Sequence, residues 1–373
     1  MHKTRVMSSE YMYWARTCSP ARFNLANSGV AGYPLANLPV KIEDLEINGP
    51  STYGYEPLQK AIAAKCGVAV ENVVATIGAS MGNFLALAAT VEPGDEVLIE
   101  HPTYELLISA ARYLGADVKR FPRRREHGFR VDPHEVEHCI SSRTRLIVLT
   151  NLHNPSSAPV DEVTLRHLGK IARSAKARVM VGEIYLDGMF EQTPRTAFHL
   201  GNEFITTNSL TKIYGLSGLR CGWILAEPDL ATRIWRLNDL MTNNPAHAAE
   251  RLSRIALANL DQIGRRSRHL LDTNRALLNS FLDEREDIEA TRFAYGTVSF
   301  PRWRHGNVDK LCDVLRDTYE TTVVPGRFFE MPDHFRLGLG CEIEIFAAGI
   351  ERLGKALDSL ASAFPSPSTA VVS

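Results

Sequence analysis

Residues 209–223 read Ser209-Leu-Thr-Lys212-Ile-Tyr-Gly-Leu-Ser-Gly-Leu-Arg220-Cys-Gly-Trp223. This stretch joins two short apolar runs, Phe204–Thr207 and Trp223–Ala226, which are typical of buried strands. It places an amine between a hydroxyl three residues before it and a guanidinium eight residues after it. Active groups of α/β sheets gather at the carboxyl ends of strands, so we expect a functional site beside Lys212.

The strand pattern recurs along the chain before this stretch. Helical patterns alternate with the apolar runs, one after Gly82 and another around Leu165. This rhythm predicts an α/β domain with a mainly parallel seven-stranded sheet flanked by helices. The five earlier runs are Val73–Ile77, Val97–Ile99, Val118–Phe121, Leu146–Leu149 and Val179–Val181.

A long helical stretch, roughly Ala246 to Leu282, separates this block from a terminal segment. That segment has strand patterns near Thr297–Phe300 and Phe335–Leu339 and a helix from about Ile343, which indicates a smaller α+β domain. We therefore expect a large domain at 46–280, a small domain built from 1–45 and 281–365, and a disordered tail at 366–373.

Composition excludes several classes of protein. The 42 Lys and Arg nearly balance the 43 Asp and Glu of the 373 residues, so neither nucleic acid nor an anionic membrane is an expected partner. The six cysteines form no CxxC pair, which argues against a disulfide framework and a thiolate metal site. No apolar run of about 18 residues is present. We expect a soluble, cytoplasmic protein that binds a small molecule and no metal.

The stretch around Lys212 resembles the cofactor-lysine signature of class I/II aminotransferases, the fold-type I enzymes that depend on pyridoxal 5′-phosphate (PLP). The resemblance covers most of the chain, from the loop Asn27–Val30 to the last helix. It implies that Lys212 holds PLP as an aldimine and later moves the α-proton, while Ser209 and Arg220 bind the phosphate ester.

Other cofactor residues follow from the same resemblance. Asn154 and Tyr185 match the residues that donate hydrogen bonds to the ring hydroxyl oxygen, which keeps the ring polarised. Ala79 and Ser80 open a helix after a strand and match the phosphate-binding segment. Tyr104 matches the aromatic residue that stacks on the pyridine ring.

The resemblance also names substrate and partner groups. Arg336, in Phe335-Arg-Leu-Gly338, is expected to bind the substrate α-carboxylate by a bidentate fork, and Gly29 to lie at the substrate. Tyr53, or nearly as well Tyr55, matches the tyrosine that reaches the neighbouring subunit's phosphate. These assignments imply a homodimer with shared active sites, acting on amino acids and 2-oxo acids.

One position departs from the family pattern. Where the family has Asp-Glu-x-Tyr, this chain reads Gly182-Glu183-Ile184-Tyr185, so the aspartate that pairs with the pyridine nitrogen is missing. Glu183 is expected to point to the opposite face of the strand. A lost charged hydrogen bond of roughly 1.5–3 kcal/mol would slow the reaction roughly 10- to 150-fold. Three explanations compete: the enzyme runs chemistry that tolerates a neutral pyridine, another group supplies the pairing, or Gly182 marks an engineered or decayed site.

Three functions remain open at this point. The first is amino transfer through Lys212. The second is elimination, replacement or cyclisation of a modified amino acid, as in enzymes similar to capreomycidine synthase; Tyr185-Leu-Asp187 and Asn208–Lys212 favour that subgroup. The third is a PLP-binding protein with little catalysis, suggested by Gly182.

Overall fold

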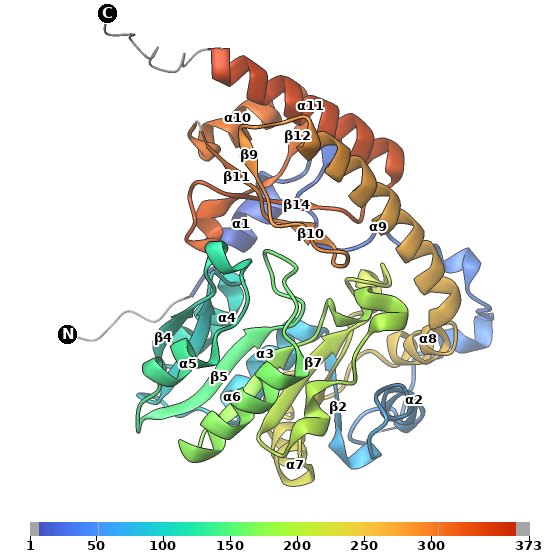
Figure 1. The fold of residues 1–373 in the computed structure, drawn as a ribbon. Helices are drawn as coiled ribbons and strands as arrows, with labels where there is room; N and C mark the ends of the chain where they lie inside the picture. Colours follow the sequence, from blue (N-terminus) through green and yellow to red (C-terminus); the bar gives the residue numbers. More distant parts are fainter. Residues whose placement is uncertain (1–6, 51, 305, 363–373) are drawn as a thin grey trace, which may run out of the picture.

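The protein consists of a larger part built on one wide sheet and a smaller part that lies above it (Figure 1). The structure is a computed structural model that describes residues 7–50, 52–304 and 306–362. The tail predicted at 366–373 lies outside these residues. No helix among them is long and apolar enough to cross a membrane.

The wide sheet confirms the predicted mainly parallel, seven-stranded architecture. Its strand order is β2-β8-β7-β6-β5-β3-β4, and β8 alone runs antiparallel to both of its neighbours. The strands are β2 (Val73–Ile77), β3 (Glu96–His101), β4 (Asp117–Pro122), β5 (Thr144–Thr150), β6 (Arg178–Gly182), β7 (Phe204–Ser209) and β8 (Cys221–Leu225).

Helices cover both faces of this sheet because the apolar side chains of its strands point both ways. One core contains Leu85, Leu107 and Ile234 from α3, α4 and α7, and a second contains Val136 and Leu168 from α5 and α6. These helices are α3 (Ala79–Ala88), α4 (Glu105–Tyr113), α5 (Pro133–Cys139), α6 (Glu162–Ser174) and α7 (Pro228–Asn238), while α2 (Glu56–Cys66) packs beside β2 and β8.

The smaller part combines three short sheets with α1 (Glu10–Thr17), α10 (Val308–Tyr319) and α11 (Ile343–Ser362). Its strands are β1 (Phe23–Asn24), β9 (Ile288–Glu289), β10 (Val298–Ser299), β11 (Arg302–Trp303), β12 (Thr321–Thr322), β13 (Val324–Pro325) and β14 (Phe335–Gly338). They pair as β1-β12, β10-β14-β13 and β11-β9. The N-terminal segment therefore joins the C-terminal one through β1. Asp44, at the end of the same segment, instead lies beside helix α8 (His247–Leu257), with its Oδ1 3.6 Å from Arg251 Nη2.

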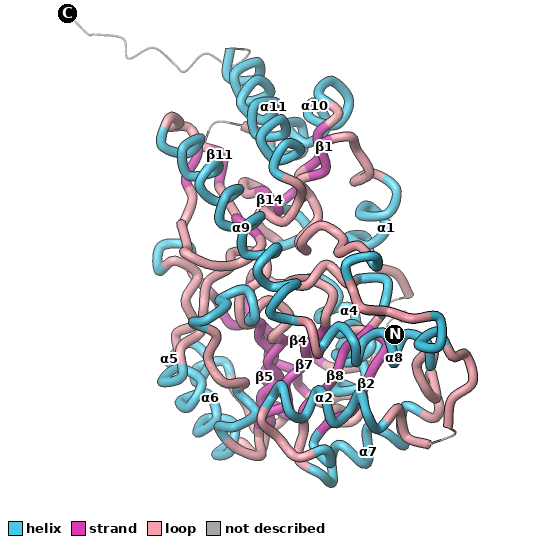
Figure 2. Tube along the Cα trace, turned by 90° about the vertical axis from the view of Figure 1, so that its right-hand side faces the viewer, coloured by secondary structure: helices cyan, strands magenta, loops and turns pink. Residues whose placement is uncertain are grey.

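The helical stretch predicted at 246–282 is divided in two. Helix α8 (His247–Leu257) ends before Asn259, whose backbone leaves the helical region, and α9 (Leu260–Asp283) begins after it. In Figures 1 and 2, α9 extends from α8 towards α11, so it links the two parts of the molecule.

Candidate functional site

A cavity of about 840 Å³ lies among the carboxyl ends of β5, β6 and β7, the start of α3, and α1. It brings together eight of the residues expected at the cofactor. They are Ala79, Ser80, Tyr104, Asn154, Tyr185, Ser209, Lys212 and Arg220. Residues from the carboxyl ends of five strands, β2, β3, β5, β6 and β7, thus meet in one place, as the parallel sheet requires.

Lys212 lies three residues beyond the end of β7 and is partly buried. Burial lowers the pKa of its amine, the charges of Arg336 and Arg220 act in the same direction, and Tyr11 opposes them. A lowered pKa increases the fraction of neutral amine, which is the nucleophilic form. Gly29 passes close to the lysine stem, because a Cβ added there would lie 3.3 Å from Lys212 Cδ.

An anion-binding corner is formed where α3 begins. No side chain caps α3, so its first backbone N–H groups can receive an anion at the positive end of the helix dipole. Gly78 has a φ of +83°, and a Cβ there would collide with the guanidinium of Arg220. No ion pair joins Arg220 to a carboxylate of the described residues, and Ser209 also faces the cavity. This corner suits a phosphate group.

Asn154 and Tyr185 stand on the other side of the cavity. The Tyr185 hydroxyl donates a hydrogen bond to Ser28 Oγ at 3.0 Å. Asn154 Oδ1 accepts one from Arg336 Nη1 at 3.0 Å. Arg336 is 1% exposed and does not itself line the cavity; its Nη2 donates to the Tyr11 hydroxyl and to the Ala26 carbonyl, each at 3.0 Å.

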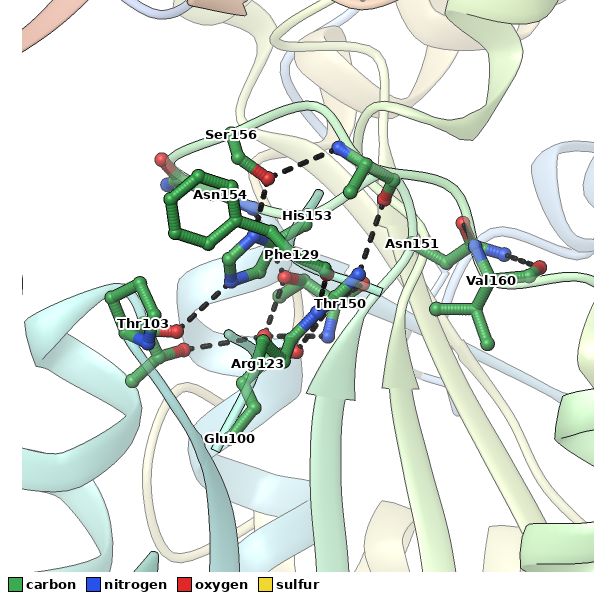
Figure 3. Close-up of polar contacts among 12 residues, drawn as sticks. Glu100, Thr103, Arg123, Phe129, Thr150, Asn151, His153, Asn154, Ser156 and Val160 are labelled. Carbon is green, nitrogen blue, oxygen red and sulfur yellow. Dashed lines mark hydrogen bonds and ion pairs between the residues drawn. The ribbon is translucent and has the colours of Figure 1, made fainter. Parts of the chain in front are cut away.

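A buried ion pair fixes the loop that carries Asn154. Arg123 Nη1 lies 2.7 Å from Glu100 Oε2, and neither side chain is exposed (Figure 3). Glu100 Oε1 accepts a 2.6 Å hydrogen bond from the Thr150 hydroxyl, which in turn accepts one from the Asn154 backbone N–H at 3.1 Å. The position of Asn154 is thus set by buried residues of β3 and β5.

Gly182 ends β6 with its missing side chain directed towards the cavity. A Cβ added there would lie 3.3 Å from Thr150 Cγ2 and 3.4 Å from Ile184 Cδ1, and both of those residues line the cavity. Glu183 points elsewhere, since its Oε1 accepts a 2.7 Å hydrogen bond from Ala197 N. Glu183 therefore does not replace the family's aspartate.

Helix α1 contributes residues to the cavity that no sequence motif predicted. Tyr11 lines the cavity, binds Arg336, and contacts Tyr104 edge to face at 5.6 Å between ring centroids. Its only sequence signal is the amphipathic spacing of Tyr11 and Trp14 behind the N-cap residue Ser9. That signal predicts a packed helix and gives no hint of a site.

Tyr53 and Tyr55 do not line the cavity of their own chain, and their predicted contact with the neighbouring subunit's phosphate stays a prediction. Tyr53 is 51% exposed and its hydroxyl donates to Asp239 Oδ2 at 3.1 Å. The ring of Tyr55 meets His247 edge to face.

The residues present fit PLP group by group. An uncapped helix start suits the phosphate, as does Arg220, which donates only to the backbone carbonyls of Ser217 and Ile77 and has no carboxylate partner among the described residues. The lowered pKa of Lys212 suits capture of an aldehyde. Asn154 and Tyr185, opposite that corner, can serve the ring hydroxyl. The one mismatch is at Gly182.

Comparisons with known proteins agree with this fit. The sequence profile of the family "Aminotransferase class I and II" matches residues 46–353. Capreomycidine synthase from Streptomyces vinaceus is 30% identical over 90% of each chain. A PLP-dependent aminotransferase from Streptococcus suis has a TM-score of 0.89 at 27% identity, covering 95% of this chain and 99% of that one. The PLP-dependent cyclase OrfR has a TM-score of 0.87 at 25% identity, covering 97% and 100%. The chain belongs to the class I and II aminotransferase family and is a PLP-dependent enzyme of fold type I.

Proposed function

We propose that the protein is an aminotransferase that moves an amino group between an amino acid and a 2-oxo acid. The observation that carries the proposal is the meeting of Lys212, Asn154, Tyr185, Ser209 and Arg220 around one cavity. PLP, when bound, supplies an electron sink for the substrate Cα.

Different residues of the chain hold the phosphate, support the ring, move the α-proton and bind the substrate carboxylate. Arg220, Ser209 and the N–H groups of Ala79 and Ser80 hold the phosphate, and Tyr104 supports the ring face. Lys212 carries the α-proton, because its lowered pKa lets it exist as a neutral base. Arg336 binds the substrate carboxylate when its present partners, Asn154 and Tyr11, give way or share the guanidinium.

The first experiment measures the absorption spectrum of the protein with PLP, before and after a pool of amino acids is added. Amino transfer predicts conversion to pyridoxamine phosphate together with release of a 2-oxo acid. Lys212→Ala should abolish covalent capture of PLP, detected by borohydride reduction and mass measurement, while the exposed Lys170→Ala should not. Capture by the Lys212→Ala protein would contradict the assignment.

A second candidate is elimination or cyclisation of an amino acid that carries a leaving group at Cβ. Two of the proteins named above, capreomycidine synthase and the cyclase OrfR, favour it, and so does Gly182. Without a carboxylate at the ring nitrogen the ring stores less negative charge. In elimination Lys212 takes the Cα proton, the Cβ–leaving-group bond breaks, and the electron pair departs with the leaving group. The products separate the two candidates, since elimination returns PLP and amino transfer returns pyridoxamine phosphate.

We also propose that the active unit is a homodimer. Most of the strongly exposed large apolar residues fall in two stretches, near 35–53 and at 240–241, which a partner subunit would cover. They are Leu35, Ile42, Leu45, Ile47, Tyr53, Leu240 and Met241. Ile42→Lys combined with Ile47→Lys should lower the mass measured by light scattering to that of a monomer, whereas Val163→Lys on α6 should not.

We also propose a location and a domain division. The six free cysteines support a reducing, cytoplasmic location. The separate cores support a division into a large domain at 46–280 and a small domain made of 1–45 and 281–365, except that Leu270, Leu271 and Leu278 of α9 pack in the core of the small domain.

A further inference from the structure

The face of the sheet beneath the cavity carries a polar pair that the sequence motifs do not include. Thr207 on β7 is the register partner of Gly182 on β6, so the side chains of both positions belong to the same face. The Thr207 hydroxyl donates a 2.6 Å hydrogen bond to Asn83 Oδ1 on α3. Asn83 is 9% exposed, and that exposure is to the cavity it lines.

The hydrogen bond from Thr207 fixes the orientation of the Asn83 amide. If the amide were turned over, the proton of Thr207 would have no acceptor among the described residues. With Oδ1 occupied in this way, the Nδ2 group has no partner among the described residues. Because Asn83 lines the cavity, this N–H group is available to donate a hydrogen bond to an acceptor bound there.

The position of this donor matches one atom of the cofactor. In PLP the ring nitrogen is para to the aldehyde, with the phosphate arm on one side of the ring and the hydroxyl on the other. When the aldehyde faces Lys212, the phosphate faces Ala79 and Arg220, and the hydroxyl faces Asn154, the ring nitrogen is directed away from Lys212. It would then point towards Gly182, the last residue of β6, and its neighbour Thr207 on β7, which is the hydrogen-bond partner of Asn83.

We propose that Asn83, held by Thr207, takes the place of the missing carboxylate and donates a hydrogen bond to the ring nitrogen of PLP. An amide N–H can only donate, so the nitrogen that accepts from it carries no proton. The enzyme therefore works with a neutral pyridine ring. This inference rests on the proposed binding of PLP at Lys212 but not on which reaction follows.

The test uses the full-length protein loaded with PLP that carries ¹⁵N in the ring, and records the ¹⁵N resonance. Free cofactor titrated in the same buffer gives the resonance ranges of the neutral and the protonated ring. The wild-type resonance is expected in the neutral range from pH 6 to pH 9. Asn83→Asp, which places a carboxylate at the same point, should move it into the protonated range. Asn202→Asp, at an exposed site, should leave it unchanged.

Affinity gives a second, independent measurement. Asn83→Leu keeps the side-chain size but removes the donor, and should weaken PLP binding roughly 2- to 12-fold, the effect of one neutral hydrogen bond. A wild-type resonance in the protonated range would overturn the proposal. So would an Asn83→Asp resonance that does not move, or an unchanged affinity in Asn83→Leu. Failure of Lys212 itself to bind PLP is recognised separately by borohydride reduction, because no labelled adduct would then form in any variant.

Discussion

The guanidinium of Arg336 and the side-chain amide of Asn154 are joined by a 3.0 Å hydrogen bond between Nη1 and Oδ1. Arg336 comes from β14 of the smaller part and Asn154 from the loop after β5 of the larger one. The group expected at the substrate carboxylate is thus connected to the group expected at the cofactor ring. A change at Arg336 should affect both.

Arg336→Lys is predicted to lower kcat/KM for the amino acid substrate. An ammonium cannot form the planar fork to a carboxylate, and loss of a charged hydrogen bond corresponds to roughly 10- to 150-fold. Steady-state kinetics measure the effect, and PLP capture by Lys212 should be retained. A variant with wild-type kcat/KM would show that another residue binds the carboxylate.

Gly182→Asp is predicted to raise transamination and strengthen PLP binding, by up to the same roughly 10- to 150-fold, through a charged partner for the ring nitrogen. The added Cβ would lie 3.3 Å from Thr150 Cγ2 and 3.4 Å from Ile184 Cδ1. The Thr150 hydroxyl donates a hydrogen bond to Glu100, which restrains Thr150, so the Ile184 side chain must move to make room for the added group. The double variant Gly182→Asp, Ile184→Val should therefore gain more than the single one. No change in rate or affinity in either variant would refute the prediction.

Gly78→Ala is predicted to weaken PLP binding because the new methyl group displaces the Arg220 guanidinium. Loss of that charged contact corresponds to roughly 10- to 150-fold in the dissociation constant, measured by fluorescence titration. Gly94→Ala is the matched control. Gly94 also has a positive φ, of +92°, but a Cβ there meets nothing within 4 Å. Equal losses in both variants would assign the effect to backbone strain.

Glu183→Gln is predicted to alter the pH dependence of stability. Burial raises the pKa of Glu183 to about 7 in the folded protein, from 4.5. The folded state then binds more protons than the unfolded state between these values, so this group's contribution to the free energy of unfolding falls as pH rises from 4.5 to 7. The difference is on the order of 3 kcal/mol.

Urea unfolding at pH 5 and pH 8 gives the free energy of unfolding of the wild type and of Glu183→Gln. Between these pH values the free energy of unfolding should fall less in Glu183→Gln than in the wild type, by on the order of 3 kcal/mol. The exposed Glu137→Gln should decline like the wild type. Equal declines in all three proteins would mean that Glu183 titrates near its ordinary pKa.

The wide sheet could be predicted from sequence because most of its strands contain a continuous apolar run, although β4 carries Lys119 and Arg120. Buried strands such as Leu146–Leu149 and Val179–Val181 can be recognised from their own apolar residues. Their predicted ends differ from the observed bounds by one or two residues. The smaller part gave a weaker signal. Most of its strands have two residues, too few to show a period of two.

The candidate site could be predicted only where local sequence encodes it. Lys212, Ser209 and Arg220 lie in one segment, so spacing reveals them. The Arg336–Asn154 and Thr207–Asn83 hydrogen bonds join residues 182 and 124 positions apart, and no local pattern describes such pairs. Tyr11 was missed for the same reason, since its partner is 325 residues away.

Strand β1 pairs in parallel with β12, matching Phe23 to Thr321. During synthesis on the ribosome, Phe23 is added to the chain almost 300 residues before its partner exists. The wide sheet can form as soon as β8 has emerged, whereas α1 and Tyr11 must wait, tethered and unpaired, until the last fifth of the chain is made. The nascent enzyme therefore acquires its phosphate corner early and its substrate arginine last, so a ribosome-bound fragment ending near residue 300 should bind phosphate groups before it can select an amino acid.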